Sequence, residues 1–305
     1  MTQHEGYAVP DRLILGINPL HGTDHYLRER ARDPARRPSI VSAARIIQIA
    51  ARSGAQGFNF EAGPEGAQLL GQLKADGFEG PLGLYPMIPD GRFFSSLLNQ
   101  GTVAAASAMV SDLSVRGKAK ALFSGGWAYL TQNPYRAIST YIGIEIDRLR
   151  RAAPPRAELR TVLVHELLTD PMVALDARVA FSEYVQRLRQ SFGVVPGFVT
   201  RNFVRFVDFC KRAGHDPRQF AIMTPVNALG FQMAPDRQSV EAALEHLGGR
   251  NVIAMSILGG GMIEFQRAVD YAQHVHGVEA FAVGLSTPEH ARSTFRAFAS
   301  RSEFA

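Results

Sequence analysis

Residues 161–199 read TVLVHELLTDPMVALDARVAFSEYVQRLRQSFGVVPGFV, and this stretch contains the unit that repeats along the chain. Two short apolar runs, TVLVH at 161–165 and VVPGFV at 194–199, flank a longer segment from Val173 to Phe192. Within that segment apolar residues recur at helical spacing and form roughly one buried stripe. The runs are continuously apolar, as is typical of strands whose sheet is covered on both faces. The stretch therefore predicts a strand, a helix and a second strand of a parallel sheet.

The same alternation continues from one end of the chain to the other. Nine short apolar runs are candidate strands: LILGI (13–17), GFNF (57–60), LGLYPM (82–87), ALF (121–123), TVLVH (161–165), VVPGFV (194–199), FAIMT (220–224), VIAMSIL (252–258) and EAFAV (279–283). The segments with helical spacing are Ile40–Arg52, Glu65–Lys74, Tyr135–Arg151, Val173–Phe192, Phe203–Ala213, Ser239–Leu247, Ile263–His274 and Pro288–Ala299. Strand and helix units of this number predict a (β/α)8 TIM barrel, with a doubly wound open sheet as the alternative. No G-x-G-x-x-G follows the first run, which weakens the alternative.

The composition is that of a soluble globular chain. The chain has 305 residues, of which 46% are hydrophobic and 20% charged, and this excludes a disordered or fibrous protein. No linker of low complexity interrupts it, so we expect a single domain over residues 1–305. No apolar run is long enough to span a membrane, and the amino terminus is polar. The only cysteine, Cys210, cannot pair within the chain, and we expect a cytoplasmic protein without a membrane partner.

The positive charge is dispersed along the chain. The net charge is +5, and the densest basic cluster, Arg28–Arg37, is interrupted by Glu29, Asp33 and Pro34. Binding to nucleic acid requires clustered basic residues, often interleaved with aromatic ones. We therefore expect a small-molecule substrate and no nucleic-acid partner.

In a barrel, the residues that follow each strand form one ring at the carboxyl face, where the active site lies. His165 ends an apolar run there and is either a satisfied core residue or a proton donor that faces the substrate. Glu61 follows the run GFNF and suits either general-base work or a salt bridge to an arginine. If the strand continues, alternation directs Glu166 to the opposite face, in a supporting or helix-contact role.

Other residues of this ring are candidates for binding. Those expected to contact the substrate are Asn18, His21, Trp127 and Arg201. His21, together with Glu61, His165 and Glu166, carries the ligand types that divalent metals use. No H-x-H or H-E-x-x-H spacing accompanies them, so we expect no metal. The triplet Gly259–Gly261 either brings backbone N–H groups to an anion or forms only a tight turn.

The order of these segments resembles the aldo-keto reductase superfamily, whose members are (β/α)8 barrels that use NADPH to reduce carbonyls. LILGINPL (13–20) is similar to the opening strand of the family, and SGAQGFNFEAGPEG (53–66) resembles its second-strand segment. TVLVHELLTDP (161–171) looks like the strand that ends in the active-site histidine. The resemblance assigns that role to His165.

The resemblance also implies a nicotinamide cofactor, NADPH or NADH. FVTRNF (198–203) resembles the Ser-Asn-Phe that holds the nicotinamide carboxamide, which places Asn202 there. VIAMSILGGGMI is similar to the glycine loop near the pyrophosphate, and VGLSTPEHARSTF looks like the final cofactor-binding turn. The residues implied by these two segments are Gly259, Gly260, Gly261, Ser286 and Thr287.

The chain departs from the family at the catalytic residues. The segment GPEG (63–66) contains no counterpart of the catalytic tyrosine, and the lysine position falls on Pro86 or Met87. On this alignment ALF is not a barrel strand, and residues 90–133 become an insertion between the third and fourth barrel strands. We expect that insertion to cover the barrel mouth as a lid.

Three functions are compatible with these features. The first is NAD(P)H-dependent reduction of a carbonyl by an aldo-keto reductase-like enzyme. The second is a non-redox isomerase or lyase, with Glu61 as base and His165 as acid, with or without a divalent metal. The third is a non-catalytic relative that binds a small ligand or a partner.

Overall fold

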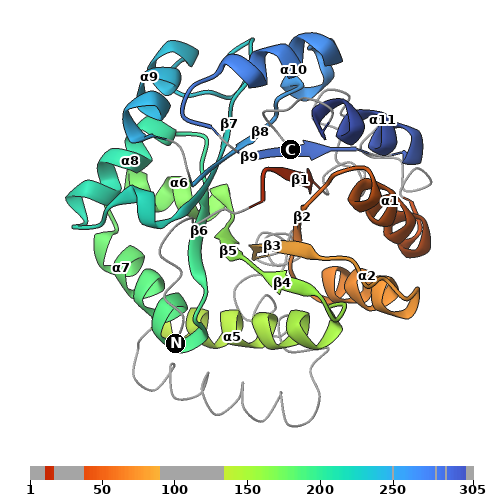
Figure 1. Ribbon diagram of the computed structural model, residues 1–305. Helices are drawn as coiled ribbons and strands as arrows, with labels where there is room; N and C mark the ends of the chain where they lie inside the picture. The colour runs from red at the N-terminus through yellow and green to blue at the C-terminus, as the bar shows by residue number, and fades with distance from the viewer. Residues whose placement is uncertain are drawn as a thin grey trace.

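The computed structural model describes residues 11–16, 38–89, 134–248, 251–278, 280–285 and 287–299. Within these ranges eight parallel strands close into a barrel (Figure 1): β1 (Leu13–Gly16), β2 (Gly57–Glu61), β3 (Leu82–Ile88), β5 (Thr161–Val164), β6 (Val195–Val199), β7 (Ala221–Pro225), β8 (Val252–Met255) and β9 (Ala280–Gly284). β2 pairs with both β1 and β3, and this closes the ring. The predicted (β/α)8 barrel is confirmed. The ALF run and residues 90–133 lie outside the described residues.

One further strand was not predicted. β4 (Ala157–Leu159) pairs with the beginning of β3, whereas β5 pairs with the end of β3. Only Arg160 separates β4 from β5, so the two strands occupy one position in the barrel. The prediction missed β4 because its sequence, AEL, is too short and too polar to stand out as an apolar run.

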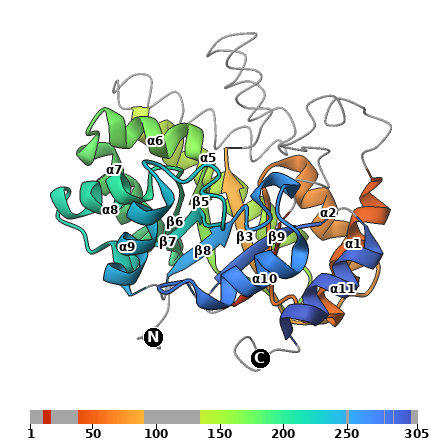
Figure 2. The same cartoon turned by 90° about the horizontal axis from the view of Figure 1, so that it is seen from above.

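Helices surround the barrel (Figures 1 and 2). They are α1 (Ile40–Arg52), α2 (Pro64–Ala75), α5 (Pro134–Ala152), α6 (Glu166–Ala174), α7 (Arg178–Arg187), α8 (Phe203–Arg212), α9 (Arg237–Leu247), α10 (Phe265–His274) and α11 (Pro288–Ala299). The prediction of one continuous helix over Val173–Phe192 is wrong. The chain leaves the helix between α6 and α7, where Asp176 adopts a left-handed conformation with φ of 50°.

Alternation along the strands separates the apolar side chains into two groups. Those inside the barrel are Ile14, Tyr85, Met87, Leu163, Val199, Ala221, Met223, Ile253, Ala280 and Ala282. Side chains of the other parity, such as Phe58, Phe60 and Phe198, pack outward in the cluster that includes the helices. Because both faces of each strand are buried, the strands read as continuous apolar runs.

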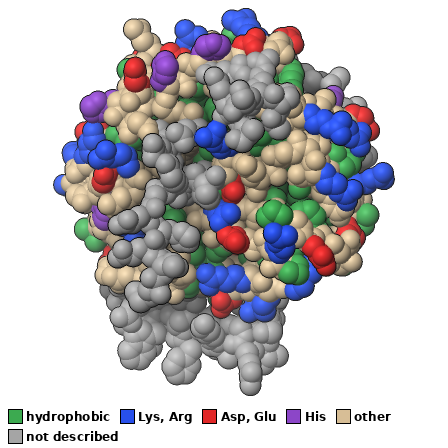
Figure 3. Space-filling model, viewed as in Figure 1, with side chains coloured by type: hydrophobic (Ala, Val, Ile, Leu, Met, Phe, Trp, Pro, Cys, Tyr) green, Lys and Arg blue, Asp and Glu red, His purple; other side chains and the backbone are tan. Residues whose placement is uncertain are grey.

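The strands all point toward the same end of the barrel, the upper side in Figure 2. Figures 1 and 3 show the opposite end, where acidic and basic side chains are interspersed on the surface. Among the described residues, no helix is long and apolar enough to cross a membrane.

Candidate functional site

Glu61, Met87 and His165 lie at the carboxyl end of neighbouring strands. Glu61 pairs with Met87 across β2 and β3, and Met87 pairs with Leu163 across β3 and β5. Met87 and Leu163 face the barrel interior, so the period of two along a strand directs Glu61 and His165 inward as well. Two strand spacings of about 4.8 Å separate the backbones of β2 and β5, or roughly 10 Å. A carboxylate and an imidazole are therefore brought to the same end of the barrel.

His165 is held at the first turn of α6. Its backbone extends the pairing of β5 with β3, because its N–H donates to the carbonyl of Ile88 at 2.8 Å. Its ring caps the helix, with Nδ1 accepting a hydrogen bond from the N–H of Leu167 at 3.1 Å. An accepting Nδ1 carries no proton, so this contact assigns the proton of the neutral ring to Nε2. Nε2–H is then a hydrogen-bond donor.

Glu166 lies beside this histidine and not on the opposite face, contrary to the expectation from alternation. The strand ends at Val164 and Glu166 begins α6, so the period of two no longer applies. One carboxylate oxygen lies 3.3 Å from Nδ1 of His165, and the other accepts a hydrogen bond from Arg201 at 3.0 Å. Glu166 therefore connects two of the predicted site residues, His165 and Arg201.

Arg201 is further fixed by an acid that the sequence analysis did not identify. Asp170 of α6 accepts hydrogen bonds from the hydroxyl of Thr200 at 2.5 Å and from the backbone N–H of Arg201 at 3.2 Å. The same hydroxyl accepts the N–H of Asn202 at 3.0 Å. Nothing in the ELLTDP segment distinguishes this aspartate from a solvated helix residue, because its partners lie about 30 residues away.

Asn202 occupies the position before α8 that the resemblance assigned to the cofactor carboxamide. Its side chain makes no capping hydrogen bond to that helix. It is half-buried and follows Arg201 directly, so it belongs to the same end of the barrel as His165.

Tyr85 does not replace the missing tyrosine. Its side chain is fully buried inside the barrel, and its hydroxyl donates to Asp11 at 2.7 Å. Asp11 precedes β1 and also pairs with Arg160, which precedes β5, so this hydroxyl lies at the amino end of the barrel. Burial is the largest cause that raises the pKa of the Tyr85 phenol, followed by the charge of Asp11. Tyr85 is thus a protonated structural donor far from the mouth.

Two backbone amides of the glycine triplet donate hydrogen bonds within their own loop. The N–H of Gly259 donates to Ser256 at 2.7 Å and that of Gly261 donates to Leu258 at 2.9 Å. All three glycines have positive φ, as a tight turn requires. The next helix, α10, is capped by the carboxylate of Glu264, which accepts from two backbone N–H groups. These amides are already occupied, and the helix terminus already holds a negative charge.

In the turn before α11, a side chain likewise accepts a backbone N–H of the same segment. Thr287 caps α11, its hydroxyl accepting the N–H of His290 at 3.2 Å. Four of the predicted residues, Asn18, His21, Trp127 and Ser286, lie outside the described residues. Among the described residues, no group of three or more His, Cys, Asp or Glu side chains could hold a metal ion.

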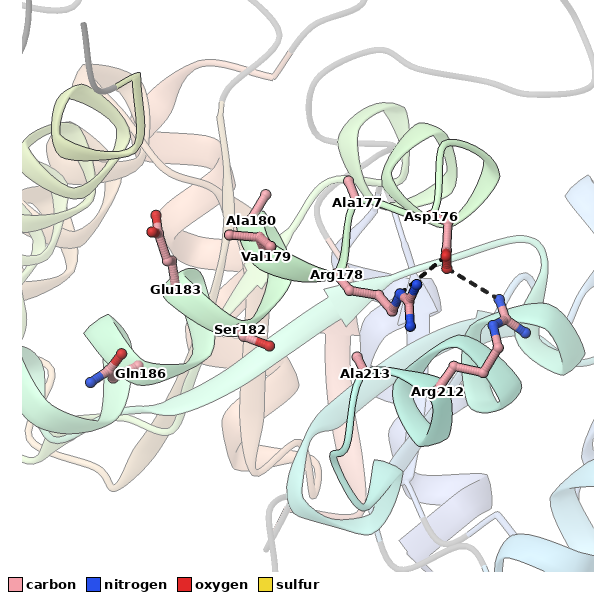
Figure 4. Close-up of a pocket in the computed structure, with 10 residues that line it drawn as sticks. All are labelled: Asp176, Ala177, Arg178, Val179, Ala180, Ser182, Glu183, Gln186, Arg212 and Ala213. Carbon is pink, nitrogen blue, oxygen red and sulfur yellow. Dashed lines mark ion pairs between the residues drawn. The ribbon is translucent and has the colours of Figure 1, made fainter.

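A surface hollow lies away from the mouth, between the start of α7 and the end of α8 (Figure 4). It contains two arginines, Arg178 and Arg212, beside the first turn of a helix, an arrangement that suits an anion. The carboxylate of Asp176 already pairs with both of them, at 3.0 Å and 3.6 Å. Arg212 also pairs with Asp208, so carboxylates of the chain already engage both arginines, and the barrel mouth remains the candidate site.

Comparison with known proteins supports the fold. Two solved structures from Pseudomonas aeruginosa, each described as a "putative aldo-keto reductase", match 95% of this chain and 90% and 91% of their own. Their TM-scores are 0.53 and 0.54, and both are 16% identical in sequence. No protein-family model and no curated protein matches the chain. At this identity the likeness is one of fold, so the chain has an aldo-keto reductase-like barrel.

Proposed function

We propose that the protein is an enzyme that moves a proton on a small carbonyl compound at the carboxyl end of the barrel, as an isomerase or a lyase. The observation that carries the proposal is the placement of Glu61 and His165 on the inward side of the mouth, on either side of the apolar Met87. The fold likeness supports a carbonyl substrate, because the similar structures are described as aldo-keto reductases.

In this mechanism Glu61 removes the proton from the carbon next to the carbonyl. The electron pair of that C–H bond forms a C=C bond, and the carbonyl π electrons move to oxygen, which gives an enolate. The Nε2–H of His165 donates a hydrogen bond to this oxygen as its charge develops. In a hydroxycarbonyl substrate the neighbouring hydroxyl gives its proton to the enolate oxygen and becomes the new carbonyl, and return of the carbon-bound proton to the former carbonyl carbon completes an isomerisation. Loss of a leaving group from the carbon on the other side of the α-carbon instead completes an elimination.

Proton exchange tests this proposal before the natural substrate is known. The protein is incubated in D₂O with a panel of small ketones, aldehydes and hydroxycarbonyl compounds, and deuterium at the α-carbon is followed by ¹H NMR. We expect exchange of at least one compound, and a loss of about 10² to 10⁴ in rate for His165→Ala and for Glu61→Gln. Glu61→Gln should keep the stability of the parent protein, and His165→Ala should lose only the roughly 1 kcal/mol of a helix cap, so both variants remain folded.

Two exposed residues of α9 provide matched controls, Glu245→Gln and His246→Ala. They remove the same chemical groups at a distance from the mouth, and the exchange rate should not change. If His165→Ala or Glu61→Gln retains the parent rate, the role of that residue is refuted. If no compound of the panel exchanges while the folded protein binds one of them, the proton-transfer reading fails.

Carbonyl reduction is a second candidate, favoured by the likeness to structures described as aldo-keto reductases. A bound nicotinamide would supply the hydride, and Asn202 and His165 are the residues placed to contact it and the substrate. Thermal-shift titration with NADPH and NADH distinguishes the two candidates, because a ligand at about 100 times its Kd stabilises a protein by roughly 2.7 kcal/mol. A saturable shift would favour reduction, and no shift at millimolar cofactor would exclude it.

A further inference from the structure

Nδ1 of His165 has two neighbours that require opposite protonation states. The backbone N–H of Leu167 is a donor at 3.1 Å and needs a lone pair on Nδ1. The carboxylate of Glu166 is an acceptor at 3.3 Å and needs a proton on Nδ1. The two contacts therefore favour different tautomers of the neutral ring, and each tautomer leaves Nε2 with a different role.

We propose that Glu166 is a positioning residue that gives His165 access to its second tautomer. With the proton on Nε2, the ring caps α6 and donates to a substrate oxygen. With the proton on Nδ1, the ring donates to Glu166, and Nε2 can accept a proton from the substrate. An isomerisation that moves a proton between two oxygens needs both roles from one side chain, so this inference rests on the proposed function and extends it to substrates with adjacent oxygens, such as hydroxycarbonyl compounds.

Arg201 holds Glu166 in the position that this role requires. The guanidinium donates to one carboxylate oxygen at 3.0 Å, which turns the other oxygen toward His165. The Glu166 side chain is 17% exposed, so the ion pair with Arg201 is only partly screened by solvent. Among the described residues, Asp170 follows on the same helix, with its carboxylate engaged by Thr200 and by the Arg201 N–H, and Glu61 ends β2.

The tautomers can be measured without any substrate. Long-range ¹H–¹⁵N NMR of uniformly ¹⁵N-labelled protein distinguishes protonated from unprotonated ring nitrogens, and His165→Ala identifies the signals of His165. In Glu166→Gln, Arg201 retains the amide oxygen as its acceptor and leaves the amide NH₂ to face Nδ1. Both neighbours of Nδ1 are then donors, and we expect the ratio of Nε2–H to Nδ1–H to rise about fivefold or more.

Arg201→Gln provides the opposite perturbation. Glutamine keeps an amide that can donate to the Glu166 oxygen, so Glu166 retains its position, but the positive charge that offsets the carboxylate is lost. The carboxylate then binds Nδ1–H more strongly, and the tautomer ratio should fall. Arg201→Gln also keeps the test valid if Glu166→Gln fails to fold. Glu183→Gln, an exposed acid on α7, is the control that should leave the ratio unchanged.

An unchanged ratio in Glu166→Gln, or shifts of the same sign in Glu166→Gln and Arg201→Gln, would overturn the inference. Turnover supplies an independent readout: we expect Glu166→Gln to lower kcat of the exchange reaction about tenfold with little change in KM. If the tautomers shift as expected and no substrate exchanges, the proposed function fails and the role of Glu166 in positioning the ring stands. If exchange is found and the tautomers do not shift, the inference fails alone.

Discussion

Replacing Tyr85 by Phe tests whether the hydroxyl of Tyr85 has a structural or a catalytic role. The hydroxyl of Tyr85 donates to Asp11 at 2.7 Å, and the side chain is fully buried. Phenylalanine fills the same space, so the variant loses a hydrogen bond and creates no cavity. A hydrogen bond to a charged partner is worth about 1.5 to 3 kcal/mol, and we expect a loss of about 2 kcal/mol in the free energy of unfolding at neutral pH. Activity should not change, because the hydroxyl lies at the amino end of the barrel.

The loss in the free energy of unfolding should depend on pH, and the pKa of Asp11 determines whether the loss is larger at neutral or at acidic pH. Burial raises this pKa above 3.8, while the hydrogen bond from Tyr85 and the charge of Arg160 lower it. Because the folded pKa lies above the unfolded one, the stability that protonated Asp11 contributes is fully present below pH 3.8 and is lost as pH rises through the folded pKa. Tyr85→Phe removes a donor to the charged carboxylate and raises this pKa further. The variant should therefore lose more stability at pH 7 than near pH 4.

Urea unfolding at the two pH values measures this difference, with Tyr184→Phe as the control. The hydroxyl of Tyr184 is also buried, but it donates to the neutral carbonyl of Val162 at 3.0 Å. Its removal should cost about 1 kcal/mol at both pH values. A Tyr85→Phe protein of parent stability that has lost activity would refute the reasoning, because it would place the hydroxyl in the catalytic machinery.

Three further predictions concern packing. Gly66→Ala would place a Cβ 2.5 Å from the carbonyl oxygen of Glu61 and should lower both stability and the rate of α-proton exchange. Gly71→Ala, whose Cβ would meet no neighbouring group within 4 Å, should lower neither stability nor exchange. Cys210 is fully buried and burial raises its pKa, so a thiol reagent should label the protein only after unfolding in denaturant. Phe198→Ala removes a fully buried ring that contacts other phenylalanines and should cost about 3 to 5 kcal/mol, measured by urea unfolding.

The barrel could be predicted because burial on both strand faces leaves a strong signal. Every described strand of the ring coincides with one of the apolar runs, and the site residues follow from the rule that parallel strands end at one face. β4 and the break at Asp176 could not be predicted in this way. Both depend on contacts with distant parts of the chain: β4 on pairing with β3, and the left-handed Asp176 on how α6 and α7 pack.

The direction of Tyr85 shows a similar limit at the level of a side chain. Alternation predicts that its ring lies inside the barrel, but not toward which end the hydroxyl points. Two glycines that pair across β2 and β3 decide this: a Cβ on Gly57 would lie 2.7 Å from the Tyr85 ring, and one on Gly83 would lie 1.8 Å from the Asp11 carboxylate. Glycine in a strand marks a close approach, yet the sequence does not identify the group that approaches.

The chemistry of the mouth follows from what each reaction requires of the protein. Hydride transfer needs a binding site for a dinucleotide. The amides of Gly259 and Gly261, which the resemblance implies for that site, donate within their own loop. The proposed proton transfer needs only a base and a donor, the roles that we propose for Glu61 and His165. Met87, one of the two positions that the resemblance assigns to the lysine, lies between them and is 7% exposed. In the proposed mechanism this apolar neighbour weakens local screening and strengthens the hydrogen bond from His165 to a developing enolate.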